Sequence, residues 1–200
     1  MKNALLLITL ATAVTQVCGQ EILGREETKR YADITHRDLK LLEKAPLKIN
    51  ANLDKAVAAR EGEHGGMVIP DTGFTAETLA KIDKDVLPVA EIWLLKLGPI
   101  CDGKLVAEEK LNVVTITNRD NSAKLPYCVA GIRKTEDKLE LVVYGKGKDP
   151  IVTLPLKSID TKQESPIEVE AETTGDGGKV TLKLAGKYKA TLDVTELLID

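Results

Sequence analysis

The sequence of 200 residues is poor in aromatic residues and in the side chains that most often carry out chemistry. One tryptophan, one phenylalanine and four tyrosines leave leucine, valine and isoleucine to form most of any core. None of the three serines lies in the Gly-x-Ser-x-Gly sequence of a nucleophile elbow. Neither His36 nor His64 has a serine, a cysteine or a second histidine beside it, and both are predicted to be solvated. The chain is therefore predicted not to be an enzyme.

Metal-binding and phosphate-binding motifs are lacking too, so we predict no metal and no cofactor. Zinc sites need several histidines or cysteines at ligand spacing, which this sequence does not offer. A structural calcium site is a weaker alternative, since loop residues offer oxygen ligands but no Asp-x-Asp-x-Asp-Gly series occurs. These loop residues include Asp120, Asn121 and Asp176. The glycines and lysines of residues 145–148 lack the Gly-Lys-Ser/Thr ending of a phosphate loop and predict a hairpin turn instead.

Neither the charge nor the apolar runs indicate a nucleic acid or a membrane as partner. The formal net charge is −3 and both signs are mixed along the chain, whereas nucleic-acid binders usually carry a concentrated basic face. After residue 19 no apolar run approaches the about 18 residues of a membrane span. The mature chain is thus predicted not to insert into a membrane.

Residues 1–19 have the pattern of a secretory signal peptide. Lys2 supplies the positive charge, residues 4–14 are mainly apolar, and residues 17–19 precede a cleavage site at Gln20. We therefore expect export, to a periplasm or outside the cell. The alternatives are an uncleaved anchor and a buried hydrophobic N-terminus.

The three cysteines allow two readings of the mature chain. Cleavage before Gln20 leaves Cys101 and Cys128, and an even count in an exported protein favours a disulfide. Two separate buried thiols are the alternative, because free cysteine behaves as a small apolar residue. A lipoprotein acylated at Cys18 is a weaker possibility, since the residues before Cys18 match such a site poorly.

Alternation of apolar and polar residues predicts a mostly β fold. A hairpin over residues 138–156 is expected at its centre, with the other strands pairing outward. Gly98 and Pro99 are expected to break the strand before them. Three alternating runs near the C-terminus predict an antiparallel meander, with pairs of glutamate and lysine on its solvent-exposed face. The predicted strands are 67–70, 89–97, 111–117, 125–132, 139–144, 151–156, 167–172, 180–185 and 188–194. Residues 47–59 are ambiguous: their first half alternates like a half-buried strand, and residues 55–60 either continue the strand or turn helical.

One or two short helices are expected near the N-terminus. The first is a loose apolar stripe from Ile34 to Leu42, capped by Asp33 or Thr35 and ended by Pro46. The alternative for this segment is an N-terminal tail of the mature chain that lies over the domain. The second covers residues 74–83, with Thr75 as N-cap. The fold class is thus an antiparallel β-sandwich-like domain of two sheets with one or two short N-terminal helices. Its predicted organisation is a signal peptide (1–19), a polar, partly helical segment (20–66) and the sandwich (67–200).

The leading hypothesis is an exported, non-enzymatic module that binds a protein or an envelope polymer or serves a structural role at the cell envelope. One alternative is a hydrolase of an extracellular polymer that uses a pair of carboxylates. The Glu168, Glu170 and Glu172 series is more simply a solvated strand face, and Trp93 is predicted to lie in the core. The other alternative is a carrier of a small apolar ligand, which needs an internal cavity with an apolar lining.

Overall fold

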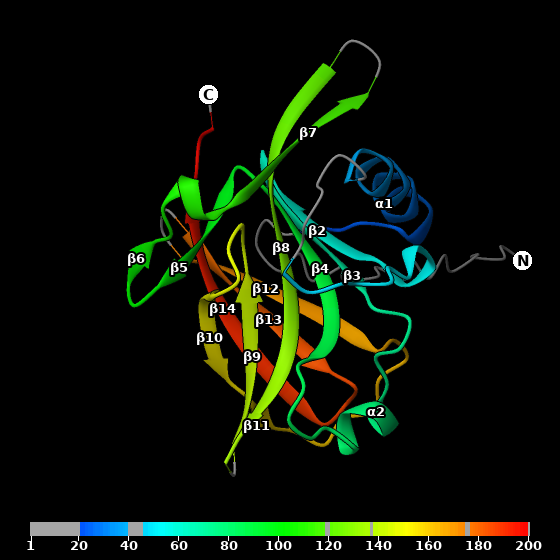
Figure 1. Ribbon diagram of the computed structural model, residues 1–200. Coiled ribbons are helices and arrows are strands. Elements are labelled where there is room, and N and C mark those ends of the chain that lie inside the picture. The colour runs from blue at the N-terminus through cyan, green and yellow to red at the C-terminus, as the bar shows by residue number, and fades with distance from the viewer. Residues whose placement is uncertain (1–20, 40–45, 119–120, 137, 175–176, 200) are drawn as a thin grey trace, which may run out of the picture.

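Over the residues that the structure describes, the protein is a sandwich of two antiparallel β-sheets with two α-helices (Figure 1). The computed structural model describes residues 21–39, 46–118, 121–136, 138–174 and 177–199. The mostly β, two-sheet fold class predicted from the sequence is confirmed. The predicted signal peptide and its cleavage site lie outside the described residues, as does Cys18. Neither described helix is long and apolar enough to cross a membrane.

The larger sheet has eight strands in the order β1-β2-β3-β4-β8-β9-β10, with β7 paired to β8. Two of these strands precede residue 67, so this sheet takes in part of the segment 20–66. The strands are β1 (Glu21–Ile22), β2 (Val57–Glu61), β3 (His64–Pro70), β4 (Leu87–Leu95), β7 (Asn112–Asn118), β8 (Asn121–Thr135), β9 (Lys138–Tyr144) and β10 (Pro150–Pro155).

The smaller sheet has six strands in the order β12-β13-β14-β5-β6, with β11 paired to β14. The predicted C-terminal meander is confirmed as the run β12-β13-β14, and Lys183 forms an ion pair of 2.5 Å with Glu170 on its exposed face. The strands are β5 (Leu97–Cys101), β6 (Lys104–Leu105), β11 (Lys157–Ser158), β12 (Ile167–Thr174), β13 (Gly177–Leu184) and β14 (Tyr188–Glu196).

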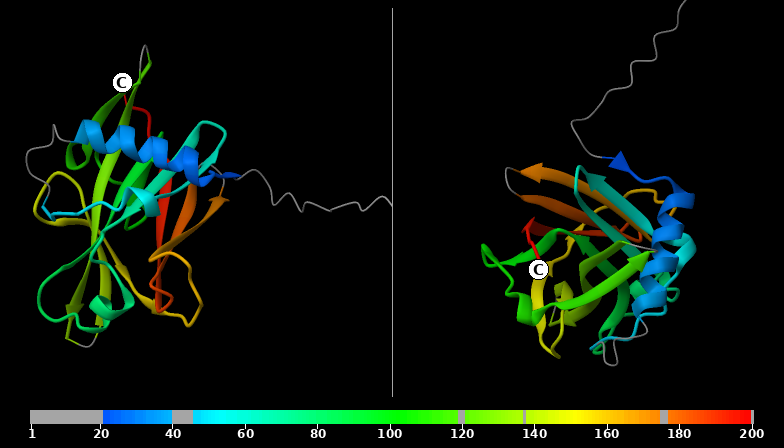
Figure 2. Two further views of the ribbon diagram at one scale, coloured as in Figure 1. Left: turned by 90° about the vertical axis from the view of Figure 1, so that its right-hand side faces the viewer. Right: turned by 90° about the horizontal axis from the view of Figure 1, so that it is seen from above.

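Strand β4 shows why the protein has two cores. Ile92 and Leu94 belong to the inter-sheet core, which the two sheets enclose. Trp93 points to the other face, where it belongs to the helix-side core beneath α1 (Arg25–Leu39). Figure 2 shows α1 lying across the strands of the eight-stranded sheet, on the side away from the six-stranded sheet. The apolar residues on both faces of this strand, noted in the sequence, are therefore explained by burial on both sides.

The hairpin predicted at residues 138–156 forms, as β9 and β10, but it does not organise the sheet. Strand β10 is the last strand of the larger sheet, and the prolines at its two ends suit an edge, because proline cannot donate to a strand ladder. The central position belongs to the 15-residue β8, which pairs with β4 on one side and with β7 and β9 on the other.

Two strand predictions were wrong in position. Residues 47–56 form an isolated bridge at Ala51 and a short 3-10 helix at Leu53–Lys55, and the strand begins at Val57. The alternating apolar residues of this segment pack against the helix-side core without a strand ladder. Gly98 and Pro99 lie inside β5, and the break falls at Lys96, whose φ is 54°. A Cβ on Gly98 would lie 2.6 Å from Leu105 Cδ1, so the glycine serves close packing.

The two helices differ in how well the sequence predicted them. Thr75 is the N-cap of α2 (Ala76–Ala80), as expected: its hydroxyl accepts from the N–H of Thr78 at 3.1 Å. Helix α1 begins at Arg25, well before the predicted start. Its fully buried residues are Thr28, Ala32 and Thr35, and Tyr31, Ile34 and Leu39 pack half-buried against the helix-side core. Ile34 and Leu39 of the predicted stripe therefore face the core, and Leu41 and Leu42 lie outside the described residues.

The disulfide favoured from the sequence is not formed. Cys101 lies at the end of β5 in the smaller sheet, and Cys128 lies in β8 of the larger sheet. Both are free thiols. Both side chains instead contribute to the inter-sheet core, as the alternative of two separate thiols expected.

Candidate functional site

A cavity of about 390 Å³ lies between the two sheets. Strands β2, β3 and β4 line it from the larger sheet, and β12, β13 and β14 line it from the smaller one. We call it the inter-sheet cavity. Its walls are mainly apolar and include Val68, Ile92, Leu94, Val169, Val180 and Val194. Val169 and Val180 are half-buried, so the cavity is reached from solvent on the side of β12 and β13.

Glycines account for the empty space. Gly66 lies on the inner face of β3 between His64 and Val68, because side chains alternate along a strand. A Cβ at Gly66 would make only ordinary contacts, at 3.5 Å from Trp93 O and 3.7 Å from Leu94 Cδ2. The structure would thus accept a side chain here, and its absence leaves the cavity open.

The glycines across the cavity are required by the smaller sheet itself. A Cβ at Gly177 would lie 2.3 Å from the carbonyl oxygen of Val194, and one at Gly178 would lie 2.7 Å from that of Glu172. Both distances are far too short, so the strands can approach this closely only with glycine at the two positions. These residues line the cavity without filling it.

Polar contacts join the two sheets around the rim. Nε2 of His64 on β3 lies 3.4 Å from Oε1 of Glu196 on β14. The hydroxyl of Thr173 on β12 donates a hydrogen bond to the carboxylate of Glu61 on β2. An apolar pocket with a charged rim suits a molecule that is mostly apolar and that meets water at one end.

A second group of polar side chains lies under α1, on the outer face of the larger sheet. Glu91 of β4 is only 1% exposed. Nε1 of Trp93 donates a hydrogen bond of 3.3 Å to its Oε2, and Nδ1 of His36 lies 3.7 Å from its Oε1. Burial raises the pKa of Glu91 to about 7, an effect that the hydrogen bond from Trp93 partly offsets.

The aromatic neighbours keep this group away from water. The ring of Tyr127 lies against that of Trp93, with centroids 4.7 Å apart and planes at 53°. Burial, and the nearby charge of Glu91, raise the pKa of the Tyr127 hydroxyl. Nδ1 of His36 is itself buried and has no hydrogen-bond partner among the described residues. We call His36, Glu91, Trp93 and Tyr127 the buried cluster.

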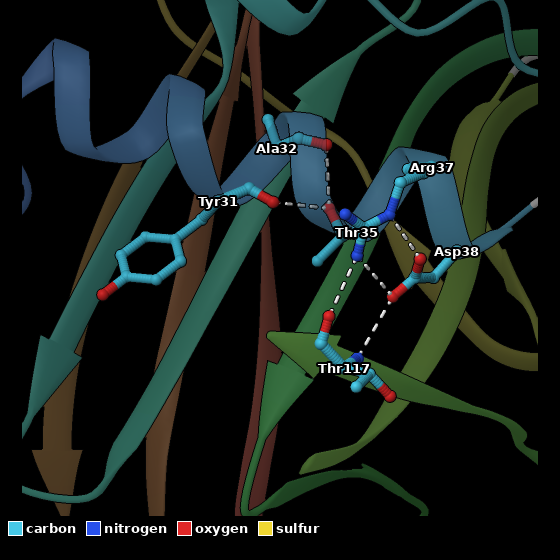
Figure 3. Close-up of polar contacts among 6 residues, drawn as sticks. All are labelled: Tyr31, Ala32, Thr35, Arg37, Asp38 and Thr117. Atoms are coloured by element: carbon cyan, nitrogen blue, oxygen red, sulfur yellow. Dashed lines mark hydrogen bonds and ion pairs between the residues drawn. The ribbon is translucent and has the colours of Figure 1, made fainter. Parts of the chain in front are cut away.

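The end of α1 is tied to the exposed edge of β7 (Figure 3). Nη2 of Arg37 donates to the carbonyl of Thr117 at 2.9 Å, and the N–H of Thr117 donates to Asp38 Oδ2 at 3.1 Å. The two side chains therefore satisfy both backbone groups of Thr117, as a neighbouring strand would. The Arg37 guanidinium holds the pKa of Asp38 below its usual value, and the N–H of Thr117 adds to the effect.

The residues singled out from the sequence lie at different sites in the structure. His64 lies at the rim of the inter-sheet cavity, and His36 faces the buried cluster, so both are only partly solvated. Trp93 is in a core, as expected. Residues 145–148 connect β9 to β10 as the predicted turn, held by a hydrogen bond from Asn112 Nδ2 to the Gly145 carbonyl.

Glu91 was missed by sequence reasoning, although the sequence held a signal. It is the acidic residue inside an otherwise apolar run, residues 86–95. A charged residue inside a strand that is apolar on both faces has to be buried, and buried carboxyls need partners. Its hydrogen-bond donor, Trp93, is two residues away in the sequence, but the histidine beside it, His36, comes from a helix far away in the sequence.

Two further findings complete the description of the site. No three histidine, cysteine, aspartate or glutamate side chains within the described ranges gather closely enough to hold a metal ion. Comparisons of the chain with protein-family models, with curated proteins and with solved structures find no match.

Proposed function

We propose that the protein binds a small, mainly apolar molecule in the inter-sheet cavity. The observation that supports this is the cavity itself: about 390 Å³ in volume, with apolar walls and a charged rim. Ligand pockets of proteins commonly measure about 300–1,000 Å³ and combine apolar walls with a few polar groups. Together with the predicted signal peptide, this makes the protein an exported, non-enzymatic carrier.

The cavity favours this function over the other two considered from the sequence. A carboxylate-pair hydrolase needs two carboxyl groups that face each other across a cleft. The cavity has carboxyl groups at its rim, those of Glu61, Glu172 and Glu196. The carboxyl group with the raised pKa that a general acid needs is that of Glu91, which lies instead under α1 with a histidine beside it. A module that binds a protein or an envelope polymer needs no internal cavity, so that hypothesis leaves the empty space unexplained.

The test uses N-phenyl-1-naphthylamine, a neutral apolar fluorophore whose emission rises when it leaves water. We expect the wild-type protein to bind it saturably and to be stabilised against heat by it, since a ligand that binds only the folded state raises Tm. Gly66→Val fills the cavity from the inner face of β3 and should weaken binding at least about tenfold, because the ligand loses its space.

Thr153→Val is the matched control. It adds a valine at an exposed position of β10, away from the cavity, and should bind the fluorophore as the wild type does. The proposal is wrong if the wild type shows no saturable binding, or if Gly66→Val binds as tightly as Thr153→Val while both fold.

A further inference from the structure

We propose that the buried carboxyl group of Glu91, which lies beside His36 at the contact of α1 with the larger sheet, is a proton-controlled clasp that holds α1 on this sheet more tightly at acidic pH than at alkaline pH. The proposal is independent of the inter-sheet cavity, which lies on the other face of the same strands. It rests on the position of one buried carboxyl group at the seam between a helix and a sheet.

The surroundings of Glu91 leave its charge poorly compensated. From α1 it faces His36, whose Nδ1 lies at 3.7 Å, within reach for an ion pair but too far for a hydrogen bond. Its neighbours in register are apolar: Ile69 on β3 and Val129 on β8. Among the described residues, Tyr127 of β8 is the other titratable group near it, and Trp93 is its hydrogen-bond donor.

The rest of α1 is held by side chains that are small or only half-buried, so one fully buried carboxyl group can still shift how firmly the helix is held. The helix buries Thr28, Ala32 and Thr35 completely, and it packs Tyr31, Ile34 and Leu39 half-buried against the helix-side core. Its ion pair from Lys29 to Asp54 is exposed, as is the guanidinium of Arg37, and exposed pairs contribute little to stability.

The direction of the effect follows from hydration. When Glu91 is protonated it is neutral, so it stays buried between α1 and the sheet without the free-energy cost of desolvating a charge. When the proton leaves, the carboxylate needs water, and water reaches it only if α1 lifts from the sheet. The pKa of Glu91 is about 7 with the helix in place and moves towards its ordinary 4.5 once hydrated. Docking is therefore strongest below pH 4.5 and weakens as the pH rises to about 7.

Hydrogen–deuterium exchange tests the proposal directly on the full chain. After correction for intrinsic rates, we expect the protection of α1 amides relative to those of β8 to fall on the order of tenfold to a hundredfold between pH 5 and pH 8. Glu91→Gln keeps the shape of the side chain but removes the ionisable group, so in this variant the α1 amides should be equally protected at pH 5 and pH 8. Glu77→Gln, at an exposed position of α2, should behave as the wild type does.

The single tryptophan provides a second measurement, which needs no variant. Trp93 bonds to Glu91, so its emission should titrate with a midpoint near pH 7, together with the loss of α1 protection. The proposal is overturned by equal protection of α1 at pH 5 and pH 8 in the wild type. It is also overturned if Glu91→Gln retains the wild-type pH dependence, or if no emission change occurs between pH 5 and pH 8.5.

Discussion

Nε2 of His64 on β3 lies 3.4 Å from Oε1 of Glu196 on β14, so a polar contact joins the two sheets at the rim of the inter-sheet cavity. The pair closes the rim between β3 and β14, so breaking it would widen the way into the cavity beyond the opening at β12 and β13. Both side chains are partly exposed, at 41% and 52%, which makes the contact easy to break. The pair is therefore placed to influence how fast a ligand exchanges more than how tightly it binds.

We predict that Glu196→Gln speeds both entry and exit of N-phenyl-1-naphthylamine by up to about fivefold, because an exposed pair contributes at most about 1 kcal/mol. The dissociation constant should stay nearly the same, since the apolar walls are unchanged. Stopped-flow fluorescence measures both rates. Asp160→Asn is the control, because it breaks an exposed pair with Lys187 whose residues do not line the cavity. Unchanged rates in Glu196→Gln would contradict the prediction.

The stability of the whole domain should depend on pH through Glu91. Its pKa is raised from 4.5 to about 7 in the folded state, so the folded chain binds more protons than the unfolded chain between these values. Stability from this group is therefore complete below pH 4.5 and falls as the pH rises to about 7. One pKa unit corresponds to about 1.4 kcal/mol, so the loss is about 3 kcal/mol.

Urea unfolding at pH 5 and pH 8 measures this loss as a difference between wild type and Glu91→Gln. The difference removes contributions from the other ionisable groups, which the two proteins share. We expect the wild type to lose more stability than the variant on going to pH 8. The same pH dependence in both proteins would show that Glu91 is not the group responsible.

The tie between α1 and β7 predicts a local effect at Thr117. Asp38→Ala removes the acceptor of the Thr117 N–H, and its loss should cost about 0.5–1.5 kcal/mol. The Thr117 amide should then exchange faster with deuterium. Because the pKa of Asp38 is lowered in the folded state, the contact is present above the ordinary aspartate pKa and is lost as the pH falls below it. Asp33→Ala, at an exposed position of the same helix, should leave the Thr117 amide unchanged.

The two cysteines should differ in reactivity. Burial raises the pKa of the Cys128 thiol to about 12, so it should not react with a thiol reagent at pH 8 in the folded chain. Cys101 is partly exposed, but partial burial and the neighbouring Asp102 raise its pKa as well, so it should react slowly. In a chain that starts at Gln20, a thiol reagent should modify one cysteine slowly when the chain is folded. It should modify both cysteines when the chain is unfolded without reductant. The absence of free thiols in the unfolded chain would mean that the disulfide forms.

The accuracy of the sequence predictions depended on how local each signal is. The cap at Thr75 was predicted correctly, because it needs only a hydroxyl and the next three residues. Helix α1 was placed too late, since its first half fully buries only Thr28 and Ala32, and these residue types resemble those of an exposed segment. The strand predicted from Leu47 was wrong because its alternating residues serve the packing under α1, and alternation alone does not distinguish the two cases.

The candidate sites were harder to predict from the sequence than the strands were. Each brings together residues from separate elements: His64 with Glu196, and His36 with Glu91. The sequence by itself determined that the chain is mostly β, with an aliphatic core and a C-terminal meander, because alternation and turns are short-range properties of the backbone. Only the tertiary structure decided that β8 is the centre, that a cavity opens between the sheets and that a carboxyl group is buried under α1. Those features depend on which strands pair and which faces of the sheets pack together. Burial of apolar surface across the whole fold determines both.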